Sequence, residues 1–193
     1  VALAEAMPLG GRVDVRTPVP TTVQVTIRGR HGNDLVRESE DAARRHEVLI
    51  LGLYPGRNEL VVRATSADGR VFEDELVVRT ADLPEHYPEI LTTRRLPSRI
   101  APGMTFLLLG HYDEDREYHP LPSAIDEHGE VRWFYDGDAG HLLRRTPEGT
   151  LLVSDDESVR EITMLGESTG REWFLPEGFH HDGELLPDGN LLA

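Results

Sequence analysis

Two adjacent histidines, His180 and His181, are the residues whose type and position most readily suggest chemistry. They stand in FHHDGELLPDGNLLA, residues 179–193, directly before a short apolar stretch and a Pro-Asp-Gly-Asn turn. Imidazole titrates close to neutral pH, so it can serve as a nucleophile, a proton donor or a proton acceptor. What either ring can do depends on the structural element that carries it.

Composition excludes several other kinds of chemistry. The sequence has no cysteine, and all 20 of its basic residues are arginine. Thiolate nucleophiles, disulfides, Schiff-base lysines and P-loop lysines are therefore ruled out. We expect neither a serine hydrolase nor a dinucleotide-binding protein nor a zinc protease, and we predict no cofactor.

The charge of the chain limits its partners. Thirty-five acidic residues against 20 basic ones give a formal net charge of −15, and most of the imbalance lies in residues 91–193. A nucleic acid would be repelled, so none is expected as a partner. No run approaches the roughly 18 apolar residues of a membrane-spanning helix, so no membrane partner is expected either.

Three acidic segments stand out in the sequence, and one of them begins like a metal-binding loop. DGDAGH, residues 136–141, begins like a calcium loop, but Pro147 occupies the twelfth position, where such a loop carries glutamate. We therefore predict no metal there. The acidic runs at 113–117 and 155–157 are interpreted as solvated charge that discourages pairing between strand edges.

The first 80 residues have the pattern of a small β-sandwich. In TTVQVTIRG, which begins at Thr21, the apolar residues Val23, Val25 and Ile27 alternate with polar ones, as in a half-buried strand. Three further strands are predicted after it, separated by a Tyr-Pro-Gly turn and an Asp-Gly hairpin signal. Only DAARRHE, residues 41–47, could be helical. The pattern is typical of immunoglobulin-like or fibronectin type III-like sandwiches.

A proline-containing linker is predicted after the sandwich, over residues 81–101. The alternating pattern stops at Thr80, and prolines then follow at positions 84, 88, 97 and 102. Such a segment is semi-rigid rather than freely flexible. The predicted domains are therefore residues 1–80, the linker, and residues 102–193.

An internal repeat of 40 residues occupies the last part of the sequence. GEVRWF at 129–134 recurs as GREWF at 170–174, which places Trp133 and Trp173 40 residues apart. HLLRRTPEGTLLV from His141 matches HDGELLPDGNLLA from His181 at the same offset. A period near 40 with one tryptophan per unit predicts β-propeller blades, in which the large ring fills the space between neighbours.

The repeat suggests where the histidines lie. If HHDGELL is the first strand of a blade, His181 begins it near one mouth of the central channel, and His141 takes the same position one blade earlier. Strand alternation sends His180 and His181 to opposite faces, so at most one of them points into the channel. Either could instead hydrogen-bond the backbone of a neighbouring blade, which is the structural alternative.

An ordered set of motifs resembles the bacterial arylsulfate sulfotransferase family across nearly all of residues 7–193. In order they are GLYPGRNELVVRATSADGRVFEDELVVRT, PSAIDEHGEVRWFYD, RRTPEGTLLV and LPEGFHHDGELLPDGNLL. The resemblance implies an all-β chain with an N-terminal β-sandwich followed by part of a six-bladed propeller. It also implies transfer of a sulfuryl group from a phenolic sulfate ester to a phenol, without a nucleotide donor.

Of the family's catalytic positions, the resemblance places only the channel histidine, at His181. His141 is a second candidate, from the repeat alone. About two blades of ~40 residues fit between 101 and 193, so we expect this chain to be the N-terminal part of a larger protein and inactive by itself. The resemblance places the nucleophilic histidine, which carries the sulfuryl group, on a later blade.

Three further expectations concern context. VALAEAM at the start resembles the remainder of a small-residue signal cleavage site, although it could be another processed end, and it favours a periplasmic or extracellular location. The protein could also form a homodimer through its N-terminal domain. The alternative function is a non-catalytic secreted propeller that binds ligands or mediates adhesion, because a fold does not determine its function.

Overall fold

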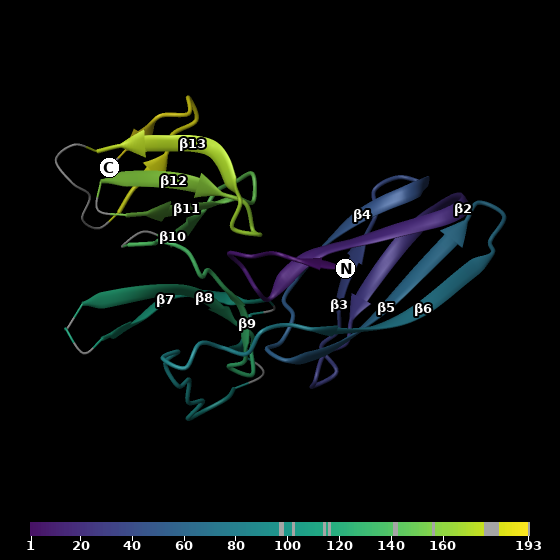
Figure 1. The fold of residues 1–193 in the computed structure, drawn as a ribbon, viewed down its shortest axis with the longest axis horizontal. Coiled ribbons are helices and arrows are strands. Elements are labelled where there is room, and N and C mark those ends of the chain that lie inside the picture. The colour runs from purple at the N-terminus through teal and green to yellow at the C-terminus, as the bar shows by residue number, and fades with distance from the viewer. Residues whose placement is uncertain are drawn as a thin grey trace. The chain divides into compact units, whose positions relative to one another are not determined.

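The computed structural model divides the chain into two all-β units (Figure 1). It describes residues 1–96, 99–101, 103–113, 115, 117–140, 143–155, 157–175 and 182–192. The first unit comprises Val1–Ala4 and Pro8–Leu83, and the second comprises Glu5–Met7 and Pro84–Ala193. The prediction of an all-β chain, a sandwich-like unit followed by propeller-like blades, is confirmed. The domain boundaries at 80 and 101 stay a prediction.

Six strands form the first unit, and all of them belong to one antiparallel sheet. They are β1 (Ala2–Leu3), β2 (Gly10–Ile27), β3 (Leu35–Glu38), β4 (Ala43–Leu51), β5 (Arg57–Ser66) and β6 (Val71–Arg79). The long β2 connects the sheet, because β1, β3, β4 and β5 all pair with it. Strand β6 pairs only with β5, and so forms an edge.

A break in the middle of β2 lets its two halves pair with different strands. Its first half pairs with β4, and the register shifts between Arg16 and Thr21. Pro18 and Pro20 lie in this interval, and proline, which cannot donate a backbone hydrogen bond, is tolerated in sheets at such irregularities. The Thr17 hydroxyl donates to the Val19 carbonyl at 2.8 Å. This side-chain hydrogen bond satisfies one backbone carbonyl within the break.

The core of the first unit follows the predicted alternation. Val23, Val25 and Ile27 are all at most 1% exposed, while Gln24 and Thr26 between them are partly exposed. Further core residues are Leu9, Val13, Val48, Ile50, Leu53, Tyr54, Leu60, Val62, Ala64 and Val78. The period of two therefore identified the buried face of these strands correctly.

The predicted helical character of residues 41–47 is wrong. From Ala43 the chain is strand β4, whose alternate residues His46, Val48 and Ile50 are buried. Seven residues make at most two turns of helix, which are marginal without packing. Pairing with β2 satisfies the backbone of this segment and buries one of its faces, so the tertiary contact overrides the local preference.

The second unit contains three successive antiparallel sheets. The first consists of β7 (Thr105–Tyr112), β8 (Tyr118–Ile125) and β9 (Val131–Phe134). The second consists of β10 (Leu143–Arg145), β11 (Leu151–Ser154), β12 (Ser158–Ile162) and β13 (Ser168–Phe174). The third is the hairpin of β14 (Glu184–Leu185) and β15 (Leu191–Leu192).

The 40-residue sequence repeat is also a repeat of hydrogen-bonding register. In the β10–β11 hairpin Arg144 pairs with Leu152, and in the β14–β15 hairpin Glu184 pairs with Leu192. Each pair is displaced by the same 40 positions. Gly149 and Gly189 turn the two hairpins with φ angles of 87° and 85°, in the left-handed region that favours glycine.

The two tryptophans occupy equivalent strands of successive sheets. Trp133 on β9 is 1% exposed, and its indole N–H donates to the Met164 carbonyl, in the turn between β12 and β13, at 2.9 Å. Trp173 on β13 packs with the buried pair Leu152 and Val159, which the residues of the following hairpin also contact. The predicted role of the rings between blades is therefore observed for Trp133.

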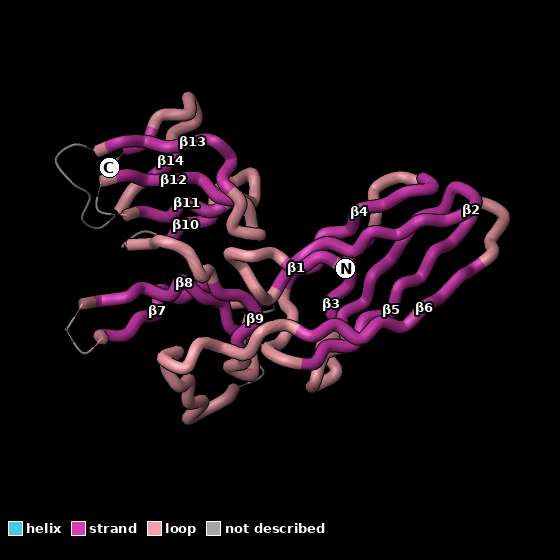
Figure 2. Tube along the Cα trace, in the orientation of Figure 1, coloured by secondary structure: helices cyan, strands magenta, loops and turns pink. Residues whose placement is uncertain are grey.

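The segment before β7 has no strand but is bonded to the first sheet of its unit (Figure 2). The Tyr87 hydroxyl donates to Ser123 Oγ at 2.6 Å. The Thr92 hydroxyl donates to the His128 carbonyl at 3.2 Å, and Arg95 Nε donates to the Glu127 carbonyl at 3.1 Å. Side chains of this irregular segment therefore fix it along β8 and the turn that follows.

A buried ion pair closes the turn between β8 and β9. The carboxylate of Asp126 lies 2.9 Å from Arg132 Nη1, and both side chains are at most 3% exposed. The same carboxylate accepts hydrogen bonds from the backbone N–H groups of His128 and Glu130. Burial by itself raises the pKa of Asp126, but the hydrogen bonds from Arg132 and from these two N–H groups outweigh it and lower the pKa.

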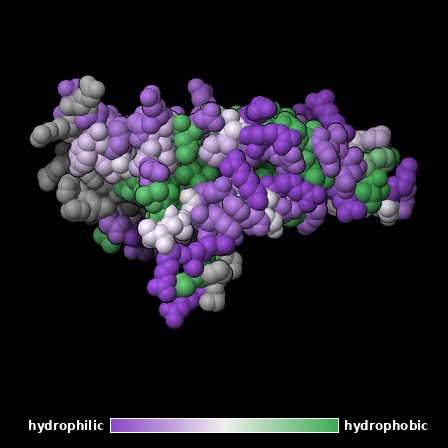
Figure 3. Space-filling model, turned by 90° about the horizontal axis from the view of Figure 1, so that it is seen from below, coloured by the Kyte–Doolittle hydropathy of each residue, from purple (hydrophilic) through white to green (hydrophobic). Residues whose placement is uncertain are grey.

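The face of the protein shown in Figure 3 is largely polar. Figure 3 shows hydrophilic side chains over most of the visible face, with apolar side chains in scattered patches. Within the described ranges, no helix has the length and apolar character needed to cross a membrane.

Replacing Asp126 by asparagine should destabilise the second unit by about 3 kcal/mol at pH 7, because the Arg132 guanidinium stays buried without its anion. Because the folded-state pKa of Asp126 is lowered, its contribution is complete above the unfolded value of about 4 and is lost as the pH falls through the folded value. Urea unfolding followed by tryptophan fluorescence measures this directly, since both tryptophans lie in the second unit.

The matched control is Glu148→Gln, at an exposed position of the β10–β11 turn, which should change the free energy of unfolding by less than about 0.5 kcal/mol. A difference between wild type and Asp126→Asn that stayed constant from pH 7 to pH 3 would contradict the ion-pair account.

Candidate functional site

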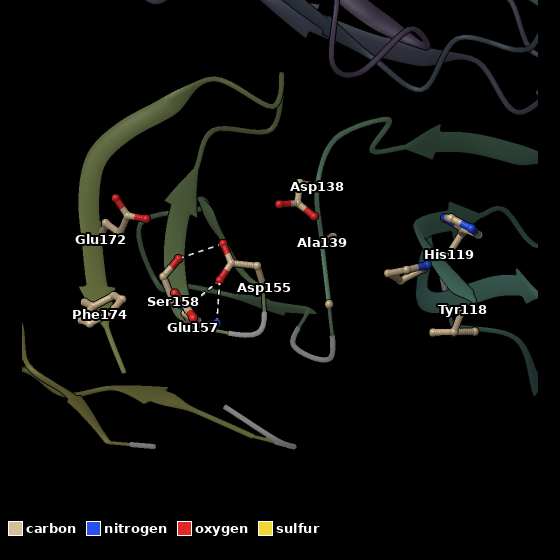
Figure 4. A pocket seen from close by; sticks show the side chains of 11 residues that line it. Tyr118, His119, Asp138, Ala139, Asp155, Glu157, Ser158, Glu172 and Phe174 are labelled. Atoms are coloured by element: carbon tan, nitrogen blue, oxygen red, sulfur yellow. Dashed lines mark hydrogen bonds between the residues drawn. The ribbon is translucent and has the colours of Figure 1, made fainter. Parts of the chain in front are cut away.

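An open groove of about 780 Å³ lies in the second unit, between its first and second sheets (Figure 4). One wall comes from the start of β8, with Tyr118 and His119, and the other from the ends of β12 and β13. The described residues that line the groove are Tyr118, His119, Pro120, Asp138, Ala139, Gly140, Asp155, Glu157, Ser158, Glu172 and Phe174.

The groove collects one end of several strands because the sheets are antiparallel. At this end β8 and β12 begin and β11 and β13 end, so residues distant in sequence reach the same place. Gly140 contributes the segment before β10, and its N–H donates to the Ser154 carbonyl at the end of β11. Loops and strand ends held by a rigid sheet are where binding and catalytic groups commonly lie.

His119 is the one imidazole among the lining residues that the structure describes, and a carboxylate orients it. Its Nε2 lies 2.9 Å from Asp113 Oδ2, across the end of the β7–β8 hairpin. The hydrogen bond from His119, and after it the bond from the Glu117 N–H, hold the pKa of Asp113 below its ordinary value. A ring with one nitrogen bound to a carboxylate has a defined tautomer and can offer the other to a ligand.

Asp155 is held on the opposite wall by three donors from the next two residues along the described chain. Its carboxylate accepts from the Glu157 N–H at 2.9 Å, the Ser158 N–H at 2.6 Å and the Ser158 hydroxyl at 3.0 Å. Burial raises the pKa of Asp155, but these hydrogen bonds together outweigh it and lower the pKa. Asp155 is therefore an ionised, positioned carboxylate at neutral pH.

The groove is negatively charged. Among the described residues that line it are four carboxylates, those of Asp138, Asp155, Glu157 and Glu172, and no arginine. The nearest guanidinium shown is that of Arg160, whose Nη2 donates to the Asp138 carbonyl at 2.7 Å and lies 3.8 Å from the carboxylates of Asp138 and Asp155. Such a lining attracts cations and disfavours a free sulfate ester.

The predicted site residues His141 and His181, together with His180, lie outside the described residues. His141 directly follows Gly140, which lines the groove, and β10 begins at Leu143. His181 falls between β13, whose last residue Phe174 lines the groove, and β14. Their assignment to a channel stays a prediction.

The interpretation of both acidic runs as solvated charge is incomplete. It fits Asp115 and Glu157, which are exposed, but Asp113 orients His119 and Asp155 closes a turn. The contact between Asp113 and His119 could have been predicted from the sequence. Pairing about the β7–β8 turn sets His111 opposite His119 and so brings Asp113 to the end of the hairpin. Recognising it required the exact register.

A Gly-x-Ser-x-Gly pattern, GESTG at 166–170, also occurs. In serine hydrolases this pattern forms a sharp turn from a strand into a helix. Here it leads from a turn into strand β13, and Ser168 Oγ accepts the Gly170 N–H at 3.1 Å. The local structure therefore gives no support to a nucleophilic role for Ser168.

Comparison with known families matches the description Arylsulfotransferase (ASST) to residues 65–193, about two thirds of the chain, including the whole groove and both predicted histidines. The chain belongs to the arylsulfotransferase family. A search of curated proteins found no match. Membership confirms the family resemblance and supports sulfuryl transfer, with aryl sulfates and phenols as the substrate class of the family.

Replacing Asp155 by alanine should cost about 1–3 kcal/mol of stability, because the N–H groups of Glu157 and Ser158 lose their acceptor. Asp138→Ala is the matched control, since this carboxylate lies in the same groove with its side chain 78% exposed, and it should cost less than about 0.5 kcal/mol. Chemical denaturation monitored by tryptophan fluorescence compares the two. Equal losses would show that Asp155 does not organise its turn.

Proposed function

We propose that this arylsulfotransferase-family protein moves a sulfuryl group from a phenolic sulfate ester to an acceptor phenol, without a nucleotide donor and through a sulfohistidine intermediate. The observation that carries the proposal is family membership over residues 65–193. The 40-residue register repeat supports it, because it provides successive blade-like hairpins of the kind that surround a propeller channel.

The chemistry explains why histidine is needed. A neutral imidazole nitrogen attacks sulfur, the bond between sulfur and the phenolic oxygen breaks, and the departing phenolate takes a proton. The acceptor phenol then attacks the same sulfur and loses its proton to a base, and the nitrogen–sulfur bond breaks. No oxidant, reductant or nucleotide enters this balance.

His181 is the residue to which we assign a role, as hydrogen-bond donor to the sulfuryl oxygens or as acid toward the leaving phenolate. His141 is a secondary candidate, since the repeat alone supports it. The family resemblance assigns the nucleophilic histidine to none of the 193 residues, so we propose it on a further blade. His119 lies with Asp113 at the groove, but the resemblance assigns it no part in the transfer.

Recognition of the sulfuryl oxygens requires cationic or N–H donors. The lining of the described groove supplies four carboxylates and no arginine. We therefore place sulfate recognition with His181 and with arginine from further blades, and not in the described groove. The negative charge of the groove would repel a sulfate ester that approached it, which would favour entry of the ester through the channel.

A second candidate function has one observation in its favour. An acidic groove with exposed aromatic side chains, Tyr118 and Phe174, suits a cationic ligand better than an anionic one. A propeller that binds such ligands without catalysis would keep the same architecture. Turnover of an aryl sulfate ester by the intact protein, absent from buffer and from heat-denatured protein, decides for the enzyme.

In the intact protein, His181→Ala should lower aryl sulfate turnover by roughly 10²–10³ while leaving the unfolding midpoint nearly unchanged, because a donor or acid acts mainly in the transition state. The matched variant is His180→Ala, on the opposite face of the predicted strand. It should leave turnover of the folded protein almost unaffected and cost about 1–3 kcal/mol of stability.

The two variants are compared by steady-state kinetics with a chromogenic aryl sulfate and by thermal unfolding. The reverse result, with transfer abolished by His180→Ala and only stability reduced by His181→Ala, would place the predicted strand one residue out of register. Full activity in both variants would remove these histidines from the mechanism.

A further inference from the structure

The end of the β7–β8 hairpin carries a cluster of side chains that sulfuryl transfer does not use. Asp113 follows β7, and Glu117 and His119 lie at the start of β8, so the two sides of the hairpin face each other through potential ligand groups. One ligand atom from each of the three residues lies within 4.8 Å of the others. A nitrogen and two carboxylate oxygens thus converge at one place.

The backbone holds this end of the hairpin in a defined conformation. The Asp113 N–H donates to the Glu117 carbonyl at 3.0 Å, and the Glu117 N–H donates to Asp113 Oδ1 at 2.8 Å. His119 Nε2 lies 2.9 Å from the other oxygen of Asp113. His119 Nε2 and Asp113 Oδ2 are therefore already close together, and the side chain of Glu117 is exposed and free to adjust.

Two more imidazoles fix the ring of His119. His111 on β7 is its cross-strand partner, stacked on it with ring centroids 5.0 Å apart. His86 stacks on the other side of His111 at 4.2 Å. Stacking restricts rotation of the His119 ring, and an ordered imidazole loses less entropy when it binds an ion.

One polar atom beside the cluster is left without a partner. Within the described part of the chain, His111 Nδ1 is shielded from solvent and makes no hydrogen bond. Unpaired buried nitrogen atoms are uncommon because they cost free energy. An unpaired nitrogen of this kind is commonly satisfied by an ordered water or an ion.

We propose that Asp113, Glu117 and His119 form a binding site for a divalent transition-metal ion of the zinc type. Bonds of about 2.1 Å in a tetrahedral site hold ligand atoms roughly 3.4 Å apart. This spacing lies between the 2.9 Å of the His119–Asp113 hydrogen bond and the 4.8 Å within which the three ligand atoms fall. The imidazole distinguishes the site from one for Ca²⁺ or Mg²⁺, which take oxygen ligands. Water completes the coordination, and the chain has no cysteine to compete for the ion.

The ion would join the two strands of the hairpin and add positive charge to the wall of an acidic groove, because His119 also lines that groove. The ligand side chains are accessible, with His119 46% and Asp113 33% exposed, so an ion can enter without unfolding. The site stands on these residues alone and does not depend on the proposed transferase function.

The test is calorimetric titration of ZnCl₂ and, separately, CaCl₂ into the intact, tag-free protein after treatment with a chelator. We expect one equivalent of Zn²⁺, bound more tightly than Ca²⁺. His119→Ala and Glu117→Gln should each weaken Zn²⁺ binding by roughly tenfold or more. The matched controls, His31→Ala and Glu148→Gln at exposed positions, should leave the dissociation constant unchanged.

Circular dichroism in the presence of chelator checks that each variant folds. If His119→Ala does not fold, the Zn²⁺ affinity of Glu117→Gln, a substitution at an exposed position, tests the proposal. X-ray absorption at the zinc edge should show nitrogen and oxygen ligands with imidazole scattering. Equal Zn²⁺ affinity in His119→Ala and His31→Ala, or tighter binding of Ca²⁺ than of Zn²⁺, would overturn the proposal.

Discussion

The packing of one indole against the next sheet is the contact on which the second unit most depends. The sheets of this unit have only two to four strands each, and a sheet so small cannot bury enough apolar surface alone. Trp133 supplies additional burial between the first and second sheets. Its ring is fully buried, and its N–H donates to the Met164 carbonyl in the turn between β12 and β13. The repeat sets Trp173 on the equivalent strand, where it packs on Leu152 and Val159, the same buried pair that Leu185 and Leu191 of the next hairpin contact. Sheet follows sheet at a fixed interval because each provides the cover that its predecessor lacks.

The turns of this unit show that one backbone geometry can be built from different side chains. The turns after β8 and β12 share the same backbone hydrogen bonds and a glycine in the left-handed region, Gly129 and Gly166. In the first turn Asp126 accepts from the backbone and from buried Arg132. In the second, Thr163 accepts the same pair of backbone N–H groups without any ion. The charged version is sensitive to pH, whereas the neutral version has no titrating group in that range.

Charge separates two tasks that a sulfotransferase must combine. A net charge of −15 and a groove lined by four carboxylates oppose the approach of an anionic ester. Arginine is the only strongly basic side chain of this sequence, and the arginines nearest the groove are engaged with acidic partners or carbonyls, as Arg160 is. Under the proposed function, sulfate recognition is therefore separate from the acidic groove, and a cation at Asp113 and His119 would reduce the negative charge of the groove.

The sequence by itself determined the strand content, the buried faces of the first unit and the repeat. These follow from interactions local in the chain: alternation decides which face of a strand is apolar, as for Val23, Val25 and Ile27, and glycine at positions such as Gly149 and Gly189 sets the turns. The family could be recognised in the same way, from an ordered set of such motifs. The roles of His141 and His181 stay predictions, since both lie outside the described residues.

Only the tertiary structure decided the features that depend on residues far apart in sequence. Residues 43–51 became a strand because β2 was available to pair with them, against a local pattern that allowed a helix. Arg132 is buried because Asp126 neutralises it, and hydropathy alone would have placed it on the surface. The acidic groove is assembled from the ends of four strands, and the cluster around His119 from the two sides of a hairpin. Both depend on the exact strand register, because a shift of one residue would send each side chain to the other face of its sheet.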